Sequence, residues 1–203
     1  MLKKIIIYFL VLLSVFLMYK YFTKKKDTAE ISNQPIHVNK HSAAFNESIS
    51  TLMKQYIAIK DALVESDTAL VKKQTITFID LLNQIDTTEI KKDTAAVFET
   101  VMYTFSDIKS NAQSIIQQHS IEEMRKDFSS MTDVMFPSLF YSLQYEGPKL
   151  YLQNCPMAFH DSIPANWLSD RAEIVNPYLG KNHPTYQSSM LHCGEIKDSV
   201  VSK

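Results

Sequence analysis

The chain has 203 residues and a net charge of −1, and 45% of its residues are hydrophobic and 11% aromatic. This composition can build a packed core, so it excludes wholesale disorder, and the length suits one ordinary domain plus an additional segment. Residues 1–26 contain six lysines and no acid, whereas the rest of the chain has 15 basic and 22 acidic residues. An acidic domain without a basic stripe argues against nucleic acid as a partner.

The amino terminus has the pattern of a membrane anchor. A short basic head precedes the uncharged run Ile5–Met18, and the apolar character continues to Phe22 with only Lys20 inside it. A run of this length either forms the core of a signal peptide or just spans a bilayer. Because no small-x-small cleavage site follows, and lysines occupy residues 24–26 instead, we expect an uncleaved transmembrane signal-anchor over residues 1–22.

The charges around this anchor leave its orientation open. Two lysines precede the apolar run and four lie within or after it, which mildly favours a cytoplasmic domain under the positive-inside rule. A basic head before an apolar core is, however, what export machinery reads as a signal. We expect export, and therefore a single-pass inner-membrane protein with its soluble domain in the periplasm. Residues 23–40 are polar and aperiodic, so they are predicted to be a tether.

Glycine and proline usage divides the remaining chain. Residues 41–146 contain no glycine and only Pro137, whereas residues 147–203 contain three glycines and five prolines. In the first part, apolar residues recur at spacings of three and four, which is typical of amphipathic helices. The four stripes are Phe45, Ile49, Leu52, Met53, Tyr56 and Leu63; Leu70, Ile76, Ile79, Leu82 and Ile85; Phe98, Val101, Met102, Phe105, Ile108, Ala112 and Ile115; and Ile121, Met124, Phe128, Met131 and Met135.

Start and stop signals separate these stripes. Ser66 and Asp67 can cap the helix of the second stripe, and Ser120 with Glu123 forms a capping box before the fourth. Pro137 should kink or end the fourth helix, because proline cannot continue a helical hydrogen-bond ladder.

These signals predict a mainly α fold. Four helices over residues 41–146 should form an antiparallel bundle, followed by an irregular, loop-rich C-terminal cap over residues 147–203. The methionines of the stripes are interpreted as core packing, since no inward Glu-x-x-His pair indicates a metal inside the bundle. Trp167, the only tryptophan, is expected to anchor the cap on the bundle.

Both cysteines lie in the last fifty residues, and each is accompanied by a methionine. The proline after Cys155 favours an extended chain there, so Cys155 and Met157 can face the same way. Met190 and Cys193 are three residues apart, which suits a turn that the following glycine permits. If the two segments meet, four sulfur atoms converge, and His192 or His160 can complete the set or replace one ligand.

The residue types leave several interpretations of this cluster open. Thiolate and thioether are soft donors that suit copper(I) far better than magnesium or calcium. A Cys155–Cys193 disulfide would instead close a loop of 39 residues and staple the cap, and the thiols could also be inert and buried. An enzyme is not expected, because no nucleophile motif or glycine-rich oxyanion loop accompanies the cysteines.

Four motifs of the C-terminal third resemble those of a known bacterial family. They are Cys155-Pro-Met-Ala, Ala165-Asn-Trp-Leu-Ser, Ile174-Val-Asn-Pro-Tyr-Leu-Gly and Met190-Leu-His-Cys-Gly. This pattern is similar to the domain of unknown function 3347, which is typical of Bacteroidetes and also occurs at the C-terminus of periplasmic adaptor subunits of heavy-metal efflux pumps. The resemblance implies an exported protein linked to copper or related heavy metals, without enzymatic activity. By position, Cys155, Met157, Met190 and Cys193 match its sulfur-bearing motif positions.

The sequence and the resemblance together predict a non-catalytic, membrane-anchored periplasmic protein. It is expected to bind copper(I) or a related soft metal for buffering or for hand-over to a heavy-metal efflux system. The predicted ligands are Cys155, Met157, Met190, Cys193 and His192. The alternative is a structural protein-interaction module whose two cysteines form a disulfide.

Overall fold

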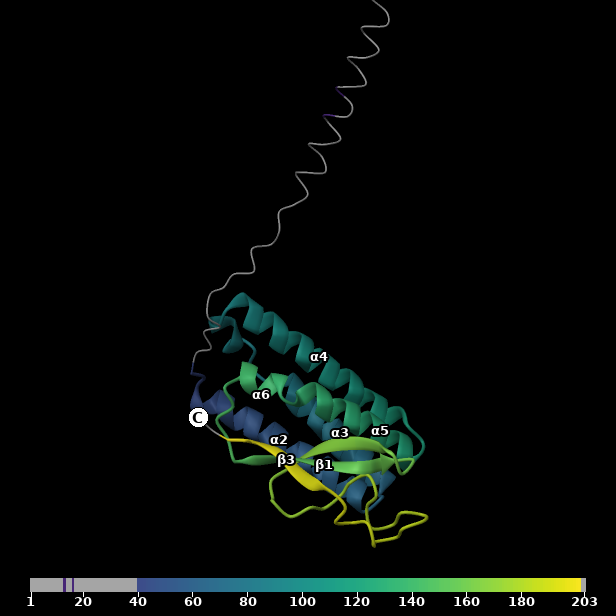
Figure 1. Ribbon diagram of the computed structural model, residues 1–203. Helices are drawn as coiled ribbons and strands as arrows, with labels where there is room; N and C mark the ends of the chain where they lie inside the picture. Colours follow the sequence, from purple (N-terminus) through teal and green to yellow (C-terminus); the bar gives the residue numbers. More distant parts are fainter. Residues whose placement is uncertain (1–12, 14–15, 17–39, 202–203) are drawn as a thin grey trace, which may run out of the picture. The chain divides into compact units, whose positions relative to one another are not determined.

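The structure is a computed structural model that describes Leu13, Phe16 and residues 40–201 (Figure 1). Apart from Leu13 and Phe16, the predicted anchor over residues 1–22 lies outside the described residues, and so does the tether up to residue 39. Among the residues that are described, no helix combines the length and the apolar character needed to cross a membrane. From Lys40 onwards the described residues belong to one compact unit.

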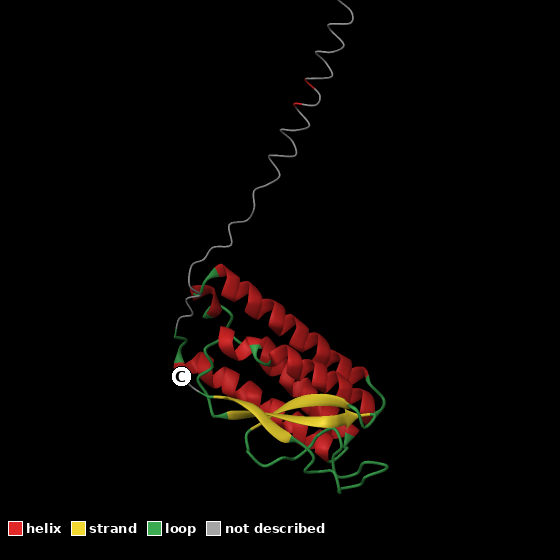
Figure 2. Cartoon of the chain, viewed as in Figure 1, coloured by secondary structure: helices red, strands yellow, loops and turns green. Residues whose placement is uncertain are grey.

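Helices make up the larger part of this unit, which confirms the prediction of a mainly α fold (Figure 2). Consecutive long helices pack against each other, and their short connections make neighbours antiparallel. The helices are α2 (Ala43–Val64), α3 (Thr68–Asn83), α4 (Ala95–Gln117), α5 (Ile121–Met135) and the short α6 (Ser138–Ser142), with a 3-10 turn, η1 (Ile90–Lys92), before α4.

Each long helix begins at a polar side chain that accepts a hydrogen bond from the backbone N–H three residues later. The four caps are Ser42, Asp67, Thr94 and Ser120. The caps predicted at Asp67 and Ser120 are therefore confirmed, although the Glu123 side chain pairs with Lys126 at 2.8 Å. α5 ends two residues before Pro137, as expected from the missing N–H of proline.

The apolar stripes predicted for α2, α4 and α5 lie in one core. Met53, Met124, Met131 and Met135 are buried in it, which confirms their interpretation as packing residues, while Met102 is half-buried. The stripe predicted for α3 is partly wrong, because Ile76 is 49% exposed and the polar residue Thr75 is buried instead. The hydroxyl of Thr75 donates to Val71 O at 2.7 Å, so this side chain enters the core with its hydrogen bond made.

The C-terminal cap corrects the prediction of an irregular, loop-rich segment, because it contains a three-stranded antiparallel sheet. In the order β2-β1-β3, its strands are β2 (Ile163–Ser169), β1 (Leu150–Phe159) and β3 (Glu195–Val200). β1 and β2 form a hairpin with Cys155 opposite Ala165, and β3 returns to pair with the other edge of β1. Polar and apolar residues do not alternate along β1, because both of its faces are buried, so the period-two pattern of a strand is absent.

Two different layers cover the two faces of the sheet (Figure 1). Asn166 and Leu168 face the bundle: the Asn166 side chain donates to Asp133 of α5 at 3.0 Å, and Leu168 is fully buried. Because successive side chains of a strand alternate, Trp167 and its cross-strand neighbour Gln153 lie on the opposite face. There the loop over residues 170–194 covers them, so the sheet is buried between helices and loop.

Candidate functional site

The structure brings the two cysteines together at the outer face of the sheet. Cys155 lies in β1 and Cys193 in the loop before β3, and their Sγ atoms are 3.2 Å apart. Both are free thiols; Cys155 is fully buried and Cys193 half-buried. The two cysteine-bearing segments therefore meet at one point, as expected.

The remaining predicted ligands differ in their burial. Met157 and Met190 are half-buried and pack against the hydrophobic core. The backbone N–H of Cys193 donates to Met190 O at 3.0 Å, which is the turn expected from their spacing. His192 is exposed, and its Nδ1 donates to Ile174 O at 2.7 Å, so its Nε2 carries the lone pair when the ring is neutral.

Among the described residues, the two thiols are not part of a larger cluster of histidine or carboxylate ligands. In residues 40–201, no group of three or more histidine, cysteine, aspartate or glutamate side chains is arranged to hold a metal ion. His160, the other histidine considered, is exposed in the turn between β1 and β2 and lines a separate cavity.

Asn176 holds the segment that carries Cys193. Its buried side chain donates from Nδ2 to Cys193 O at 2.8 Å, and its backbone N–H donates to Leu191 O at 2.8 Å. Its Oδ1 accepts from the backbone N–H groups of Tyr178 and Leu179, at 2.8 and 3.1 Å. Asn176 thus joins the turn over residues 176–180 to the cysteine segment and fixes the position of the Cys193 backbone.

A fully buried pair, Gln153 and Trp167, lies on the same face of the sheet as Cys155. The Gln153 amide donates to the carbonyls of three consecutive loop residues, 171–173. Gly194 has φ +145°, and an added Cβ would lie 2.8 Å from Asn154 O and 2.9 Å from the Trp167 ring. Only glycine therefore lets the residue after Cys193 approach the sheet this closely.

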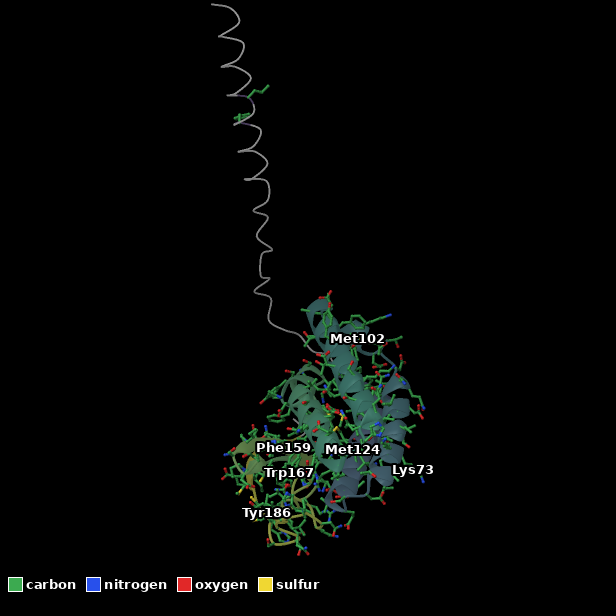
Figure 3. The ribbon with its side chains drawn as sticks, turned by 90° about the vertical axis from the view of Figure 1, so that its right-hand side faces the viewer. Lys73, Met102, Met124, Phe159, Trp167 and Tyr186 are labelled. Carbon is green, nitrogen blue, oxygen red and sulfur yellow. The ribbon has the colours of Figure 1, made fainter. Side chains whose placement is uncertain are left out.

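Tyr178 connects the loop over residues 170–194 to the helical bundle. Its ring lies edge-on to Trp167 at 5.9 Å and 6.3 Å from Phe128 of α5, and its hydroxyl donates to Asn166 O. Trp167 is therefore linked to the helices through Tyr178. Figure 3 labels Trp167, Phe159 and Tyr186 at the same end of the molecule, opposite Met102.

The Cys193 thiol is a weak acid in this position. Burial raises its pKa to about 11, and the adjacent Cys155 thiol adds to the rise. Because the thiolate is both the nucleophile and the metal ligand, an unassisted Cys193 reacts slowly at neutral pH. A metal bound here must displace the proton from the sulfur.

Sequence reasoning missed the supporting residues of this site. In the sequence, Asn176 stands out only as a member of the Ile174-Val-Asn-Pro-Tyr-Leu-Gly motif and Gly194 only as the glycine of the turn after Cys193, while Gln153 belongs to no motif. Their roles follow from contacts between residues 17 to 40 positions apart, such as those of Asn176 with Cys193 and of Gly194 with Asn154.

Comparison with known proteins identifies one family. The family model described as "Protein of unknown function (DUF3347)" matches residues 52–142, which run from within α2 to the end of α6. The match thus lies on the helices and not on the C-terminal motifs on which the resemblance rests. The description of the family does not mention efflux adaptors. No curated protein and no solved structure matches the chain. Residues 52–142 of the chain are thus similar to the DUF3347 family of unknown function.

Proposed function

We propose that this protein is a non-catalytic binding protein for copper(I) or a related soft metal ion, with Cys155 and Cys193 as its main ligands. The observation that carries the proposal is the pair of free thiols 3.2 Å apart, one buried and the other partly accessible. Thiolate sulfur prefers soft ions such as copper(I) over hard ions. A preformed thiol pair reduces the ordering cost of binding, because the protein fold already holds both donors.

The separation of the sulfur atoms suits an ion between them after a small adjustment. Two sulfurs at ~2.3 Å from one tetrahedral metal ion are about 3.8 Å apart, so the pair must open by roughly 0.6 Å. The Cys193 side chain can supply this movement because it is only half-buried, while Asn176 keeps its backbone in place. Met157 and Met190 are the thioethers placed on the same two segments, and His192 offers its Nε2.

The weak acidity of the Cys193 thiol agrees better with a binding role than with a catalytic one. The raised pKa of Cys193 disfavours the thiolate that a nucleophilic enzyme requires at neutral pH. The His192 ring is hydrogen-bonded to Ile174 O, where it orients a ligand nitrogen rather than activating a thiol. Together with the N-terminal sequence pattern, this favours a membrane-anchored periplasmic protein that buffers the ion or passes it to an efflux partner.

The direct test is competition for copper(I) against a chromophoric chelator under reducing conditions, using residues 27–203. Wild type should withdraw copper from the chelator with a stoichiometry of one, and the Cys155→Ser, Cys193→Ser double variant should not. Met157→Leu and Met190→Leu should weaken binding, whereas Met102→Leu on α4 is the matched control. Equal competition by wild type and the double cysteine variant would show that the proposal is wrong.

The same pair of sulfurs favours a second candidate, a structural interaction module with a permanent disulfide. Disulfide sulfurs are ~2.05 Å apart, so the thiols would have to approach by about 1.1 Å, which is also a small movement. Mass spectrometry after alkylation of protein extracted from cells, with and without reductant, separates the two. A fully bridged population that takes up no copper after reduction supports the module.

A further inference from the structure

A second cavity, of about 240 Å³, lies among α5, the turn after β1 and the loop around residues 183–186. Its lining residues are different from the proposed metal ligands. The half-buried ring of Phe159 and the buried ring of Tyr178 form an apolar part of the wall, and charged and polar side chains form most of the rest. The cavity therefore offers a small ligand both an apolar and an ionic surface.

Arg125 of α5 lines this cavity and is only 2% exposed. Its Nε donates to Pro177 O at 2.8 Å, and its Nη2 donates to Leu63 O and to Ser66 Oγ, both at 3.0 Å. A guanidinium has five N–H donors, so these three contacts do not satisfy it. Within residues 40–201, no hydrogen bond reaches Nη1 and no carboxylate lies within 4.0 Å of the group.

Among the described residues, the charge of Arg125 therefore has no counter-ion in contact with it. Its hydrogen bond to Leu63 O near the C-terminal end of α2 provides only the partial negative charge of a helix terminus. Burial accordingly lowers the pKa of Arg125 to about 10, and Glu122 opposes the shift only from a distance. A buried charge of this kind is costly unless an opposite charge joins it.

Two further donors line the same cavity. The Nδ1 of His183 accepts from the backbone N–H groups of Thr185 and Tyr186, both at 3.2 Å, so its proton is on Nε2. Lys126 lies one position after Arg125 and is partly exposed; one N–H of its ammonium donates to Glu123 at 2.8 Å, which leaves its other two N–H groups for a ligand. Of the two acids that line the cavity, Asp161 is engaged by the Tyr186 hydroxyl, which leaves Glu122 at the rim.

We propose that this cavity binds the oxyanion group of a small molecule, a phosphate or a carboxylate. The Nη1 edge of Arg125 is the central donor, with His183 and Lys126 as rim donors. Arginine suits this role because its planar donors match the oxygen atoms of phosphate and carboxylate. This site is independent of the proposed copper site, since the two share no residue.

The test is a titration of 15N-labelled residues 27–203 with inorganic phosphate, and separately with acetate and benzoate, at constant ionic strength maintained with chloride. Saturable amide shifts are expected at residues 122–126, 158–161 and 183–186. Benzoate should bind more tightly than acetate, because Phe159 and Tyr178 can pack on its ring. Linear shifts with all three anions, of the size that chloride alone causes, would overturn the proposal.

Variants identify the donors. Lys126→Gln should weaken binding about two- to fivefold and Glu122→Gln should strengthen it by a similar factor, since both are rim charges. His183→Gln should also weaken binding about two- to fivefold, because it removes the Nε2–H donor. Arg125→Lys keeps the charge but loses the planar pair of guanidinium donors, and should weaken binding about tenfold. Because Arg125 also joins three segments of the chain, the Arg125→Lys variant is compared with wild type only if its dispersed amide spectrum shows that it is folded.

Lys73→Gln, on the exposed face of α3, is the matched control for loss of one positive charge (Figure 3). It should leave phosphate binding unchanged. If Lys73→Gln and Lys126→Gln weaken binding equally, and Glu122→Gln has no effect, the anion is attracted by net charge alone and the cavity is not its site.

Discussion

The hydroxyl of Tyr56 is the contact at which α2, α5 and the sheet meet, and Tyr56→Phe tests it. The backbone N–H of Leu168 donates to this hydroxyl at 3.2 Å, and the hydroxyl lies 2.6 Å from Thr132 Oγ1. Since Thr132 Oγ1 donates its own proton to Phe128 O at 3.0 Å, Tyr56 must be the donor to Thr132. The bonds therefore run in one direction, from β2 through α2 to α5.

The expected cost follows from what the variant leaves unpaired. The Leu168 N–H is fully buried and would lose its acceptor, whereas Thr132 would keep its bond to Phe128. The phenylalanine ring can still stack on Phe128 at 4.9 Å, so no large cavity forms. An unsatisfied buried donor costs about 1–3 kcal/mol, and we expect the free energy of unfolding to fall by that amount.

Urea unfolding of residues 27–203, followed by circular dichroism, measures this change. Tyr103→Phe is the matched control, because Tyr103 is 73% exposed on α4 and its substitution should change stability by less than about 0.5 kcal/mol. If the two variants are equally stable, the bond through Tyr56 does not hold the sheet on the bundle.

Three further predictions concern the loop over residues 170–194. Asn176→Ala should lower the free energy of unfolding by about 2 kcal/mol, because it leaves buried N–H groups without their acceptor, and it should slow disulfide formation between Cys155 and Cys193 under mild oxidant. Gly180→Ala should destabilise by more than about 1 kcal/mol in thermal unfolding, since φ is +60° and the new Cβ would lie 2.7 Å from Arg125 Nη2. Alkylation of Cys193 by iodoacetamide at pH 7 should be about 100-fold slower in folded than in urea-unfolded reduced protein, because its pKa rises from 9.0 to about 11. The rate in folded protein should increase about tenfold per pH unit above pH 7, as the thiolate fraction grows.

Each of these has an outcome that contradicts it. Wild-type rates of disulfide formation in Asn176→Ala would mean that this side chain does not position Cys193. Unchanged stability of Gly180→Ala would mean that the loop is not packed as closely on Arg125 as the structure indicates. An alkylation rate that reaches its plateau below pH 9 would reveal a low-pKa thiol and reopen the enzymatic interpretation.

The helices are the part of the fold that local sequence largely determines. The start of α5 at Ser120 and its end before Pro137 depend on residues within a few positions, and its buried methionines follow the helical period. The face of α3 was less predictable, because Ile76 and Thr75 are adjacent and only packing against the neighbouring helices decides which is buried. Local sequence therefore determines where a helix begins and ends more firmly than it determines which face of the helix is buried.

The sheet could not be predicted from local pattern. β1 is buried on both faces and contains Pro156, so it lacks both the alternation and the composition of an ordinary strand. Its pairing with β3 joins Leu150 to Val200, and such distant pairs leave no periodic trace in the sequence.

For the site, the sequence by itself determined the donor types and the local turn at Cys193, because both depend on residue chemistry and near neighbours. Only the tertiary structure decided that Cys155 and Cys193 lie 3.2 Å apart, that Asn176 holds one of them, and that Arg125 is buried with no carboxylate partner in residues 40–201. The physical reason is that spacing along the chain encodes contacts within one or two turns. Contacts between distant segments depend on how all the buried surfaces pack together.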